Sequence, residues 1–276
     1  MLELPESTVL SRQLREAAAG KTVTRAVAGA SPHRFTFFTP GAGELPGLLE
    51  GRTVDDAQPS GGLVEIALGN LRLTLGDGVN LRWLAPGAAR PAKHQLLLEL
   101  SDGSALAATV QMYGGISAFP AGENENFYYL VTKEKPSPLS GGFDRSYFEG
   151  LLSQCKPTLS AKAFLATEQR IPGLGNGVLQ DILFQARVHP RRRLETLGSG
   201  ALDALYHSVK TTLADMAQYG GRDTERDLYG QAGGYCTLLS AKTWKGPCPV
   251  CGGPIVRQAY LGGNVYFCPH CQRSQS

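Results

Sequence analysis

The chain has 276 residues, of which 42% are hydrophobic, enough to bury the core of one large domain or two modest ones. No apolar run is long enough to span a bilayer, and no basic segment followed by an apolar one marks a signal peptide, so neither a membrane protein nor a secreted one is expected. The net charge of +3 is unevenly placed, because residues 151–276 hold 14 Lys and Arg against 8 Asp and Glu, whereas residues 1–150 hold 13 against 16. This asymmetry favours a polyanionic partner for the C-terminal half, although chance surface variation also produces such differences.

Residues 1–120 are predicted to form an N-terminal antiparallel β-sandwich domain capped by one helix. Pro5 and Glu6 suit the first turn of that helix, and Gly20 suits its end. The pattern then changes to short apolar runs separated by turn signals, such as Gly76-Asp77-Gly78, which is typical of antiparallel strands. The strands are expected at residues 22–27, 34–38, 63–68, 71–75, 95–100 and 105–110.

Residues 121–142 are rich in Pro and Gly and are interpreted as a linker to a helical domain at residues 143–235. Helical periodicity predicts four helices, at residues 144–153, 158–165, 177–186 and 199–218. The glycine-rich run Gly173-Leu174-Gly175-Asn176-Gly177 precedes the third of them. A helix N-terminus offers free N–H groups to a phosphate, and Asn176 adds a side-chain donor there. A plain turn between two helices explains the same run, just as a solvated surface explains Arg191-Arg192-Arg193.

Residues 236–276 are predicted to form a zinc-ribbon finger. Two C-x-x-C pairs lie sixteen residues apart, at Cys248, Cys251, Cys268 and Cys271. This spacing is typical of a tetrahedral Cys₄ site that holds one structural Zn²⁺, and a pair of disulfides is the alternative. Two β-rich runs flank Gly262-Gly263-Asn264, where the turn of a hairpin is expected. Cys155 and Cys236 have no C-x-x-C neighbour and are expected to be reduced thiols in a reducing compartment, the cytoplasm.

Four sequence blocks together resemble the formamidopyrimidine-DNA glycosylase and endonuclease VIII family. They are Glu3-Leu4-Pro5-Glu6, Gly173–Gly177 with Ala186-Arg187-Val188-His189-Pro190, Gly220-Gly221-Arg222-Asp223, and the ribbon ending in Cys268-Pro269-His270-Cys271-Gln272. The resemblance implies an α+β fold with a helix-capped β-sandwich, a helix–two-turn–helix domain and a Cys₄ zinc finger. It also implies a monomeric DNA-repair protein, associated with the nucleoid in a bacterium, that bends damaged or abasic duplex DNA in the interdomain cleft and flips out the lesion.

The resemblance further implies base removal and cleavage at abasic sites. In the family the nucleophile is the α-amine of an N-terminal proline that removal of the initiator Met exposes, and a carboxylate moves protons at the sugar. Here Leu2 occupies the position of the proline, and Glu3 that of the carboxylate. Because a large residue at position 2 normally blocks Met removal, Met1 is expected to remain, with its amine one residue out of place. The alternative role of Glu3 is that of a charge at a helix N-terminus.

Three further features of the family are missing from this chain. The β-domain lysine is absent from Gln58–Gly62, and Gly262-Gly263-Asn264 replaces an arginine at the finger tip. An Arg-Arg-Phe-Gly run that fills the gap left by a flipped base is replaced by Gln111–Gly115, in which an apolar side chain can still enter the base stack. The DNA contacts expected from the resemblance are Met112, Tyr113, Asn176, Arg222 and Asn264.

Three functions are compatible with these patterns. The sequence slightly favours a glycosylase and abasic-site lyase that uses Met1, or Leu2 after processing, together with Glu3. The second is a catalytically impaired or inactive homologue that binds damaged or structurally unusual DNA. The third is a zinc-ribbon protein that binds RNA or another protein, against which the order of the four blocks argues.

Overall fold

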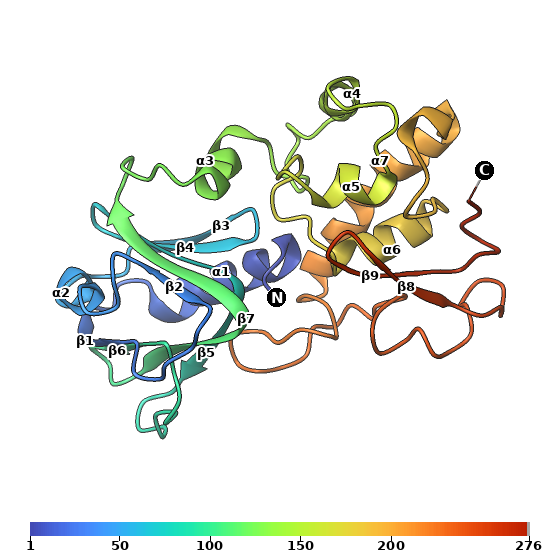
Figure 1. Cartoon of the computed structure of the whole chain (residues 1–276). Coiled ribbons are helices and arrows are strands. Elements are labelled where there is room, and N and C mark those ends of the chain that lie inside the picture. The colour runs from blue at the N-terminus through green and yellow to red at the C-terminus, as the bar shows by residue number, and fades with distance from the viewer. Residues whose placement is uncertain (275–276) are drawn as a thin grey trace.

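The computed structural model describes residues 1–274. A sheet with its own helices lies beside a group of further helices and a C-terminal hairpin (Figure 1). One hydrophobic core lies between α1 and the sheet, a second lies among the helices, and a smaller third lies under the hairpin. Among the described residues, no helix is long and apolar enough to cross a membrane.

The N-terminal part begins with α1 (Leu4–Ala18), which buries an apolar face against the sheet and has Pro5 in its first turn. The sheet contains β1 (Val23–Ala28), β2 (Thr36–Thr39), β3 (Asp56–Ser60), β4 (Leu63–Leu68), β5 (Leu71–Leu84), β6 (Leu96–Leu100) and β7 (Ala105–Pro120), with the short α2 (Leu45–Leu49) between β2 and β3. The strand order is β1-β6-β7-β5-β4-β3. The predicted antiparallel β-sandwich is confirmed, although β2 pairs with β7 in parallel.

The two long strands β5 and β7 differ from their predicted lengths. The expected turn at Gly76-Asp77-Gly78 is wrong, because these residues continue β5 through a bulge opposite β7. A Cβ placed on Gly78 would lie 1.9 Å from the carbonyl oxygen of Gln111, so glycine permits a close approach of two backbones here. On the opposite strand Met112 has a positive φ of 64°. The glycines that suggested a turn thus allow a bend within two continuous strands.

The helical part contains α3 (Phe127–Glu134), α4 (Arg145–Ser153), α5 (Ala161–Ala166), α6 (Val178–Gln185), the short 3₁₀ helix η1 (Leu194–Thr196) and α7 (Ser199–Gln218). Four of these confirm the predicted helices within a few residues. The helix α3 lies within residues 121–142, where the sequence predicts a linker and no helix. Asn126 supplies the missing signal, because its side chain accepts a hydrogen bond from the N–H of Tyr128 and caps the helix.

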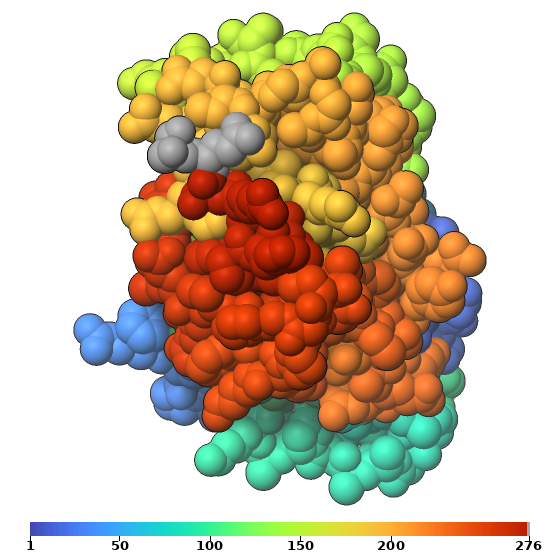
Figure 2. Space-filling view, turned by 90° about the vertical axis from the view of Figure 1, so that its right-hand side faces the viewer, coloured from blue at the N-terminus to red at the C-terminus, as the bar shows by residue number. Residues whose placement is uncertain are grey.

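The C-terminal hairpin consists of β8 (Val256–Tyr260) and β9 (Gly263–Phe267). Its turn is at Leu261-Gly262, both with positive φ, so the expected turn at Gly262-Gly263-Asn264 lies one residue too far along the chain. In Figure 2 the finger, in red, lies against the yellow and orange helical segments. The buried Lys162 of α5 donates to the carbonyl oxygen of Tyr260 at 2.6 Å, which fixes the hairpin to the helices.

The predicted domain boundaries remain predictions, but one segment connects the two parts. Residues 222–234 lead from α7 towards the finger, and from them Leu228 is buried in the core of the sheet. The N–H of Leu228 donates to Gln13 of α1 at 3.0 Å, and its carbonyl oxygen accepts from Trp83 of β5 at 2.8 Å. This segment therefore holds the N-terminal part against the helical part.

Candidate nucleic-acid interface and N-terminal site

The backbone of Leu2 lies between the β5 bulge and the glycine-rich run. Its nitrogen is a peptide N–H that donates to the carbonyl oxygen of Asp77 at 2.7 Å. Two residues later, the N–H of Leu4 donates to the carbonyl oxygen of Gly173 at 2.8 Å. The side chain of Leu2 is 9% exposed and belongs to the core around α1. A large apolar side chain in this place stabilises the fold by its burial.

The carboxylate of Glu3 is buried at the N-terminus of α6. One oxygen accepts from the N–H of Gly177 at 2.8 Å and the other from Val178 at 2.7 Å. These donors are among the groups that a helix leaves unpaired in its first turn, and the negative charge suits the positive end of the helix dipole. Burial raises the pKa of Glu3, while the Arg222 guanidinium and the two backbone donors oppose that rise.

Arg222 forms a buried ion cluster with two glutamates of the N-terminal segment. Its Nε and Nη2 atoms donate to the two carboxylate oxygens of Glu6 at 2.9 and 2.8 Å, and Nη1 lies 3.3 Å from Glu3 Oε2. Gly177 leaves the room for it, because a Cβ there would lie 1.7 Å from Arg222 Nη1. The Arg222 guanidinium is thus buried and paired inside the protein, and its contact with a DNA phosphate, expected from the sequence, stays a prediction.

Met1 lies at the surface rather than in the core. Its amino group donates to Glu225 Oε2 at 2.8 Å, and the residue is 40% exposed. Glu225 belongs to the same segment that carries Leu228. Of the three catalytic candidates, Met1 is thus the only one whose nitrogen is an exposed amine, while Leu2 and Glu3 are buried.

In the stretch Gln58–Gly62, where the expected lysine is absent, the glycines of the β3–β4 turn make close backbone contacts. Gly61 and Gly62 form the β3–β4 turn, and a Cβ on Gly62 would lie 3.2 Å from the carbonyl oxygen of Leu2. A Cβ on Gly173, whose φ is +80°, would lie 2.5 Å from the carbonyl carbon of Gly61. The turn therefore packs by its backbone against the N-terminus and the glycine-rich run. This contact was not predicted from the sequence, in which the Gly-Gly pair was the available signal.

The expected DNA contacts form two groups. On the helical side Asn176 donates to the carbonyl oxygen of Asn264 at 3.1 Å, which holds the finger hairpin beside the glycine-rich run. On the sheet side Met112 is 70% exposed and Tyr113 is also exposed. Burial raises the pKa of Tyr113, and the neighbouring Asp77 carboxylate adds to the rise. Arg191 of the triple-arginine run lies over the Tyr260 ring of the finger, 4.6 Å from its centroid.

The four cysteines of the finger form a cluster that fits one zinc ion. Their sulfur atoms all lie within 4.8 Å of one another, with Sγ–Sγ distances of 3.8 Å for Cys248 and Cys271 and 3.5 Å for Cys251 and Cys268. Four sulfurs at about 2.3 Å from a tetrahedral zinc ion are about 3.8 Å apart. The distances also exclude disulfides, whose sulfurs are about 2.05 Å apart. The site therefore holds one structural Zn²⁺.

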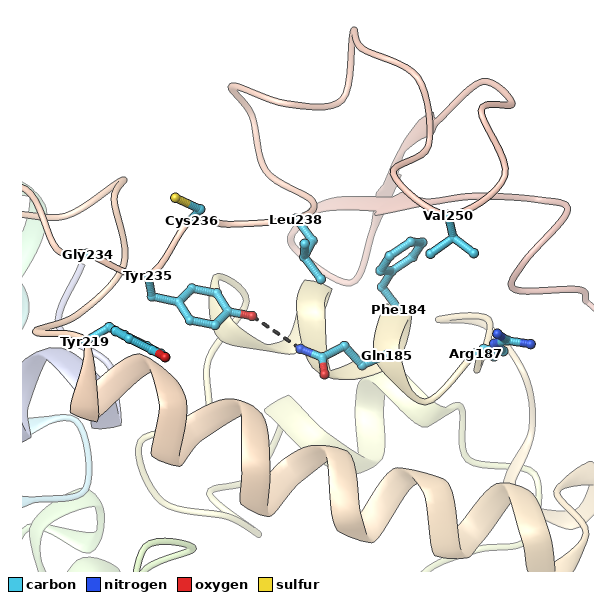
Figure 3. A pocket seen from close by; sticks show the side chains of 9 residues that line it. All are labelled: Phe184, Gln185, Arg187, Tyr219, Gly234, Tyr235, Cys236, Leu238 and Val250. Atoms are coloured by element: carbon cyan, nitrogen blue, oxygen red, sulfur yellow. Dashed lines mark hydrogen bonds between the residues drawn. The ribbon is translucent and has the colours of Figure 1, made fainter.

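A large cavity lies between the helical part and the finger, and none of the catalytic candidates Met1, Leu2 and Glu3 lines it (Figure 3). It has a volume of about 570 Å³ and lies where the ends of α6 and α7 meet the segment that enters the finger. Tyr219 and Tyr235 line one end, Phe184 and Val250 the other, and Tyr235 Oη accepts from Gln185 at 3.3 Å. None of the residues predicted to contact DNA lines this cavity.

The chain is similar to known proteins over nearly its full length. Residues 245–273 match the zinc finger found in FPG and IleRS. The chain is 30% identical to the formamidopyrimidine-DNA glycosylase of Alkalilimnicola ehrlichii over 286 residues, covering 99% of this chain and 100% of that protein. It superposes on the MutM (Fpg) protein of Thermus thermophilus with a TM-score of 0.80 at 27% identity, covering 99% and 100% of the two chains. A complex of Lactococcus lactis Fpg with DNA containing an abasic site matches with a TM-score of 0.84 at 24% identity over the same shares.

Proposed function

The chain belongs to the formamidopyrimidine-DNA glycosylase family, and from this premise we propose that it binds abasic or damaged duplex DNA without forming a covalent intermediate through Leu2. The family consists of DNA glycosylases and abasic-site lyases, in which an amine attacks the sugar. The observation that carries the proposal is the large side chain of Leu2, which is buried in the core around α1. A large residue at position 2 normally blocks removal of Met1, so the Leu2 nitrogen is expected to stay in a peptide bond, where it donates to Asp77. A peptide nitrogen has no available lone pair for attack on a carbon atom.

The surroundings of Glu3 give it a structural role that does not need catalysis. Both of its oxygens accept backbone N–H groups of α6, and Arg222 lies against one of them. In this arrangement Glu3 stabilises the junction between the N-terminus and α6. Each oxygen keeps a second lone pair, so a role of Glu3 in proton transfer stays a prediction that the trapping experiment below tests. The glycine contact of the β3–β4 turn encloses Leu2 from the other side.

DNA binding itself is supported by the fold and by the placement of exposed groups. The Lactococcus lactis protein with the same fold was crystallised with abasic-site DNA. In this chain Met112 and Tyr113 project from the sheet part, and Asn176 and Asn264 meet on the helical part. We propose that these four residues contact DNA that lies across the two parts, with the zinc finger as the support of Asn264.

A second candidate function is an abasic-site lyase that uses Met1. It is favoured by one observation: the Met1 amine is at the surface, 2.8 Å from the Glu225 carboxylate. An unprotonated amine attacks C1′ of the ring-opened abasic aldehyde, and loss of water gives an imine. Glu225 is within hydrogen-bond distance to accept the proton that the nitrogen releases.

Borohydride trapping on abasic duplex separates the two candidates. Binding without chemistry predicts tighter binding to abasic than to intact duplex by fluorescence anisotropy, with no covalent adduct even at high protein concentration. An adduct that maps to Met1 and is lost in Glu225→Gln would instead establish the lyase. Leu2→Pro is the matched gain-of-function control, since a free proline amine is expected to restore trapping once intact mass shows that Met1 is removed. Equal, weak affinity for both duplexes would contradict the proposed DNA-damage binding.

A further inference from the structure

The first turn of α3 exposes large apolar side chains. Phe127 is 59%, Tyr128 61% and Leu130 39% exposed, and the two rings meet edge to face with centroids 5.7 Å apart. Contiguous exposed apolar groups of this kind commonly mark an interaction surface. We call these three residues the α3 face.

The opposite side of α3 is firmly anchored to the sheet. Val131 is buried, and Tyr129 packs edge to face on Phe119 at a centroid distance of 4.9 Å. Lys133 forms an ion pair with Glu65 of β4 at 2.7 Å. Because these contacts fix the helix, the exposed rings of the α3 face have a defined orientation that the fold does not require for its own packing.

The α3 face is continuous with the N-terminal site. In Figure 1, α3 lies above the β3–β4 hairpin, whose turn points towards the N-terminus. Thr132 of α3 hydrogen-bonds Ser60 next to that turn, and Gly62 on its far side lies against Leu2. The charges that act on Tyr113 are those of Asp77, Tyr128 and Glu3, so this exposed ring belongs to the surroundings of both the α3 face and the N-terminal site.

Charge differs between the two ends of α3. Lys135 follows the helix, donates to the carbonyl oxygen of Gln169 at 2.8 Å and lies near Arg170, although Glu134 beside it carries the opposite charge. Glu123 and Glu125 precede the helix. A phosphate backbone that passes the α3 face is therefore expected at the Lys135 end.

We propose that the α3 face stacks unpaired nucleotides of the DNA that the N-terminal site holds, so that the preferred ligand is a damaged duplex with an adjoining single-stranded segment. The inference rests on the proposed DNA binding and adds the class of substrate. Bases within a duplex cover each other's faces, whereas unpaired bases offer a free face to an aromatic ring. Such stacking tolerates any sequence, which suits a face without side chains that read base edges.

The test compares three DNAs by fluorescence anisotropy at one salt concentration: an abasic duplex, the same duplex with a run of unpaired thymines beside the abasic site, and a duplex with the unpaired thymines but no abasic site. Wild-type protein is expected to bind the second more tightly than the first, and the double variant Phe127→Ala/Tyr128→Ala to lose about tenfold in affinity for it while keeping its affinity for the first. Tyr219→Ala is the matched control, because Tyr219 is 59% exposed at the end of α7, beside the separate cavity. Thermal unfolding verifies that the variants fold.

Each result bears on one claim. If the double variant binds the unpaired DNA as tightly as wild-type protein does, the proposal is overturned. If wild-type protein prefers the unpaired segment whether or not the abasic site is present, the stacking holds while the proposed damage recognition fails. If Tyr219→Ala weakens binding as much as the double variant does, stacking on α3 is not the cause.

Discussion

Arg222 forms a buried bidentate ion pair with Glu6, a residue 216 positions away in the sequence, and a longer contact with Glu3. A buried ion pair is costly to break, because the remaining charge keeps its desolvation penalty without its partner. The cluster thus fastens α1 to the end of α7 and to the start of α6. The sequence shows each of the three residues but not their pairing, so the internal ion cluster could not be predicted from it, and a phosphate contact of Arg222 stays a prediction.

Asp181 is a second buried carboxylate, in α6, and it determines a pH dependence. Its oxygens accept from the N–H groups of Leu238 and Leu239 at 2.9 and 2.8 Å, and burial raises its pKa to about 6 from an ordinary 3.8, partly offset by those bonds. Since the folded state binds the proton more tightly, this stabilisation is complete below pH 4 and is lost as the pH rises through 6.

Urea unfolding of wild-type protein and Asp181→Asn at pH 5 and pH 7 checks this dependence. The free energy of unfolding of wild-type protein minus that of the variant is expected to be about 1.3 kcal/mol larger at pH 5 than at pH 7. The difference isolates Asp181, because Glu3 and the other titrating groups are common to both proteins. A difference that stays constant or increases with pH would contradict the assignment.

At the level of elements, α7 and β4 have the bounds that periodicity predicts, because each carries one uninterrupted pattern. Where the local signal and the tertiary context disagree, the prediction fails. Glycines in β5 suggested a turn, but in the structure they permit a bulge against β7. The helix α3 was not predicted, because the Pro and Gly residues of its segment indicated a linker. The finger hairpin was placed correctly, with its turn one residue too late.

The finger depends on its metal, since its small core contains two of the zinc ligands themselves. One zinc per chain is expected by elemental analysis of wild-type protein and of Cys236→Ser, whose thiol is exposed and outside the cluster. Cys271→Ser, or a strong chelator, is expected to remove the zinc. Amide hydrogen exchange should then rise across residues 245–273, including β8 and β9, while the sheet around α1 stays protected. Unchanged exchange in the finger after loss of zinc would contradict a structural role for the metal.

For the whole molecule, the family motifs predicted the fold and the order of its parts, because they are spread over nearly the full chain. The enclosure of the N-terminal site could not be predicted from the sequence. It arises from Gly61, Gly62 and Gly173, which meet only after β3–β4 and the glycine-rich run are brought together. The absence of a lysine was visible, whereas the backbone contact in its place depends on the tertiary structure.

A substitution at Leu228 gives the best test of whether residues 222–234 hold the sheet part and the helical part together. It is fully buried in the core around α1, although its segment follows α7, and Asp227 beside it accepts from Gln13 at 2.9 Å. Leu228→Ala is expected to lower the free energy of unfolding by about 2–5 kcal/mol, since truncation leaves a cavity. The exposed Leu261→Ala in the finger turn is the control, with an expected change within about 0.5 kcal/mol.

Leu228→Ala is also expected to weaken binding to abasic duplex, because the loosened segment no longer fixes the sheet part, with Met112 and Tyr113, relative to the helical part, with Asn176. Urea unfolding and anisotropy measure the two effects on the same samples. Loss of stability without loss of affinity would mean that the segment supports the fold but not the orientation of the two parts on DNA. A variant as stable as wild-type protein would show that residues 222–234 do not hold the parts together.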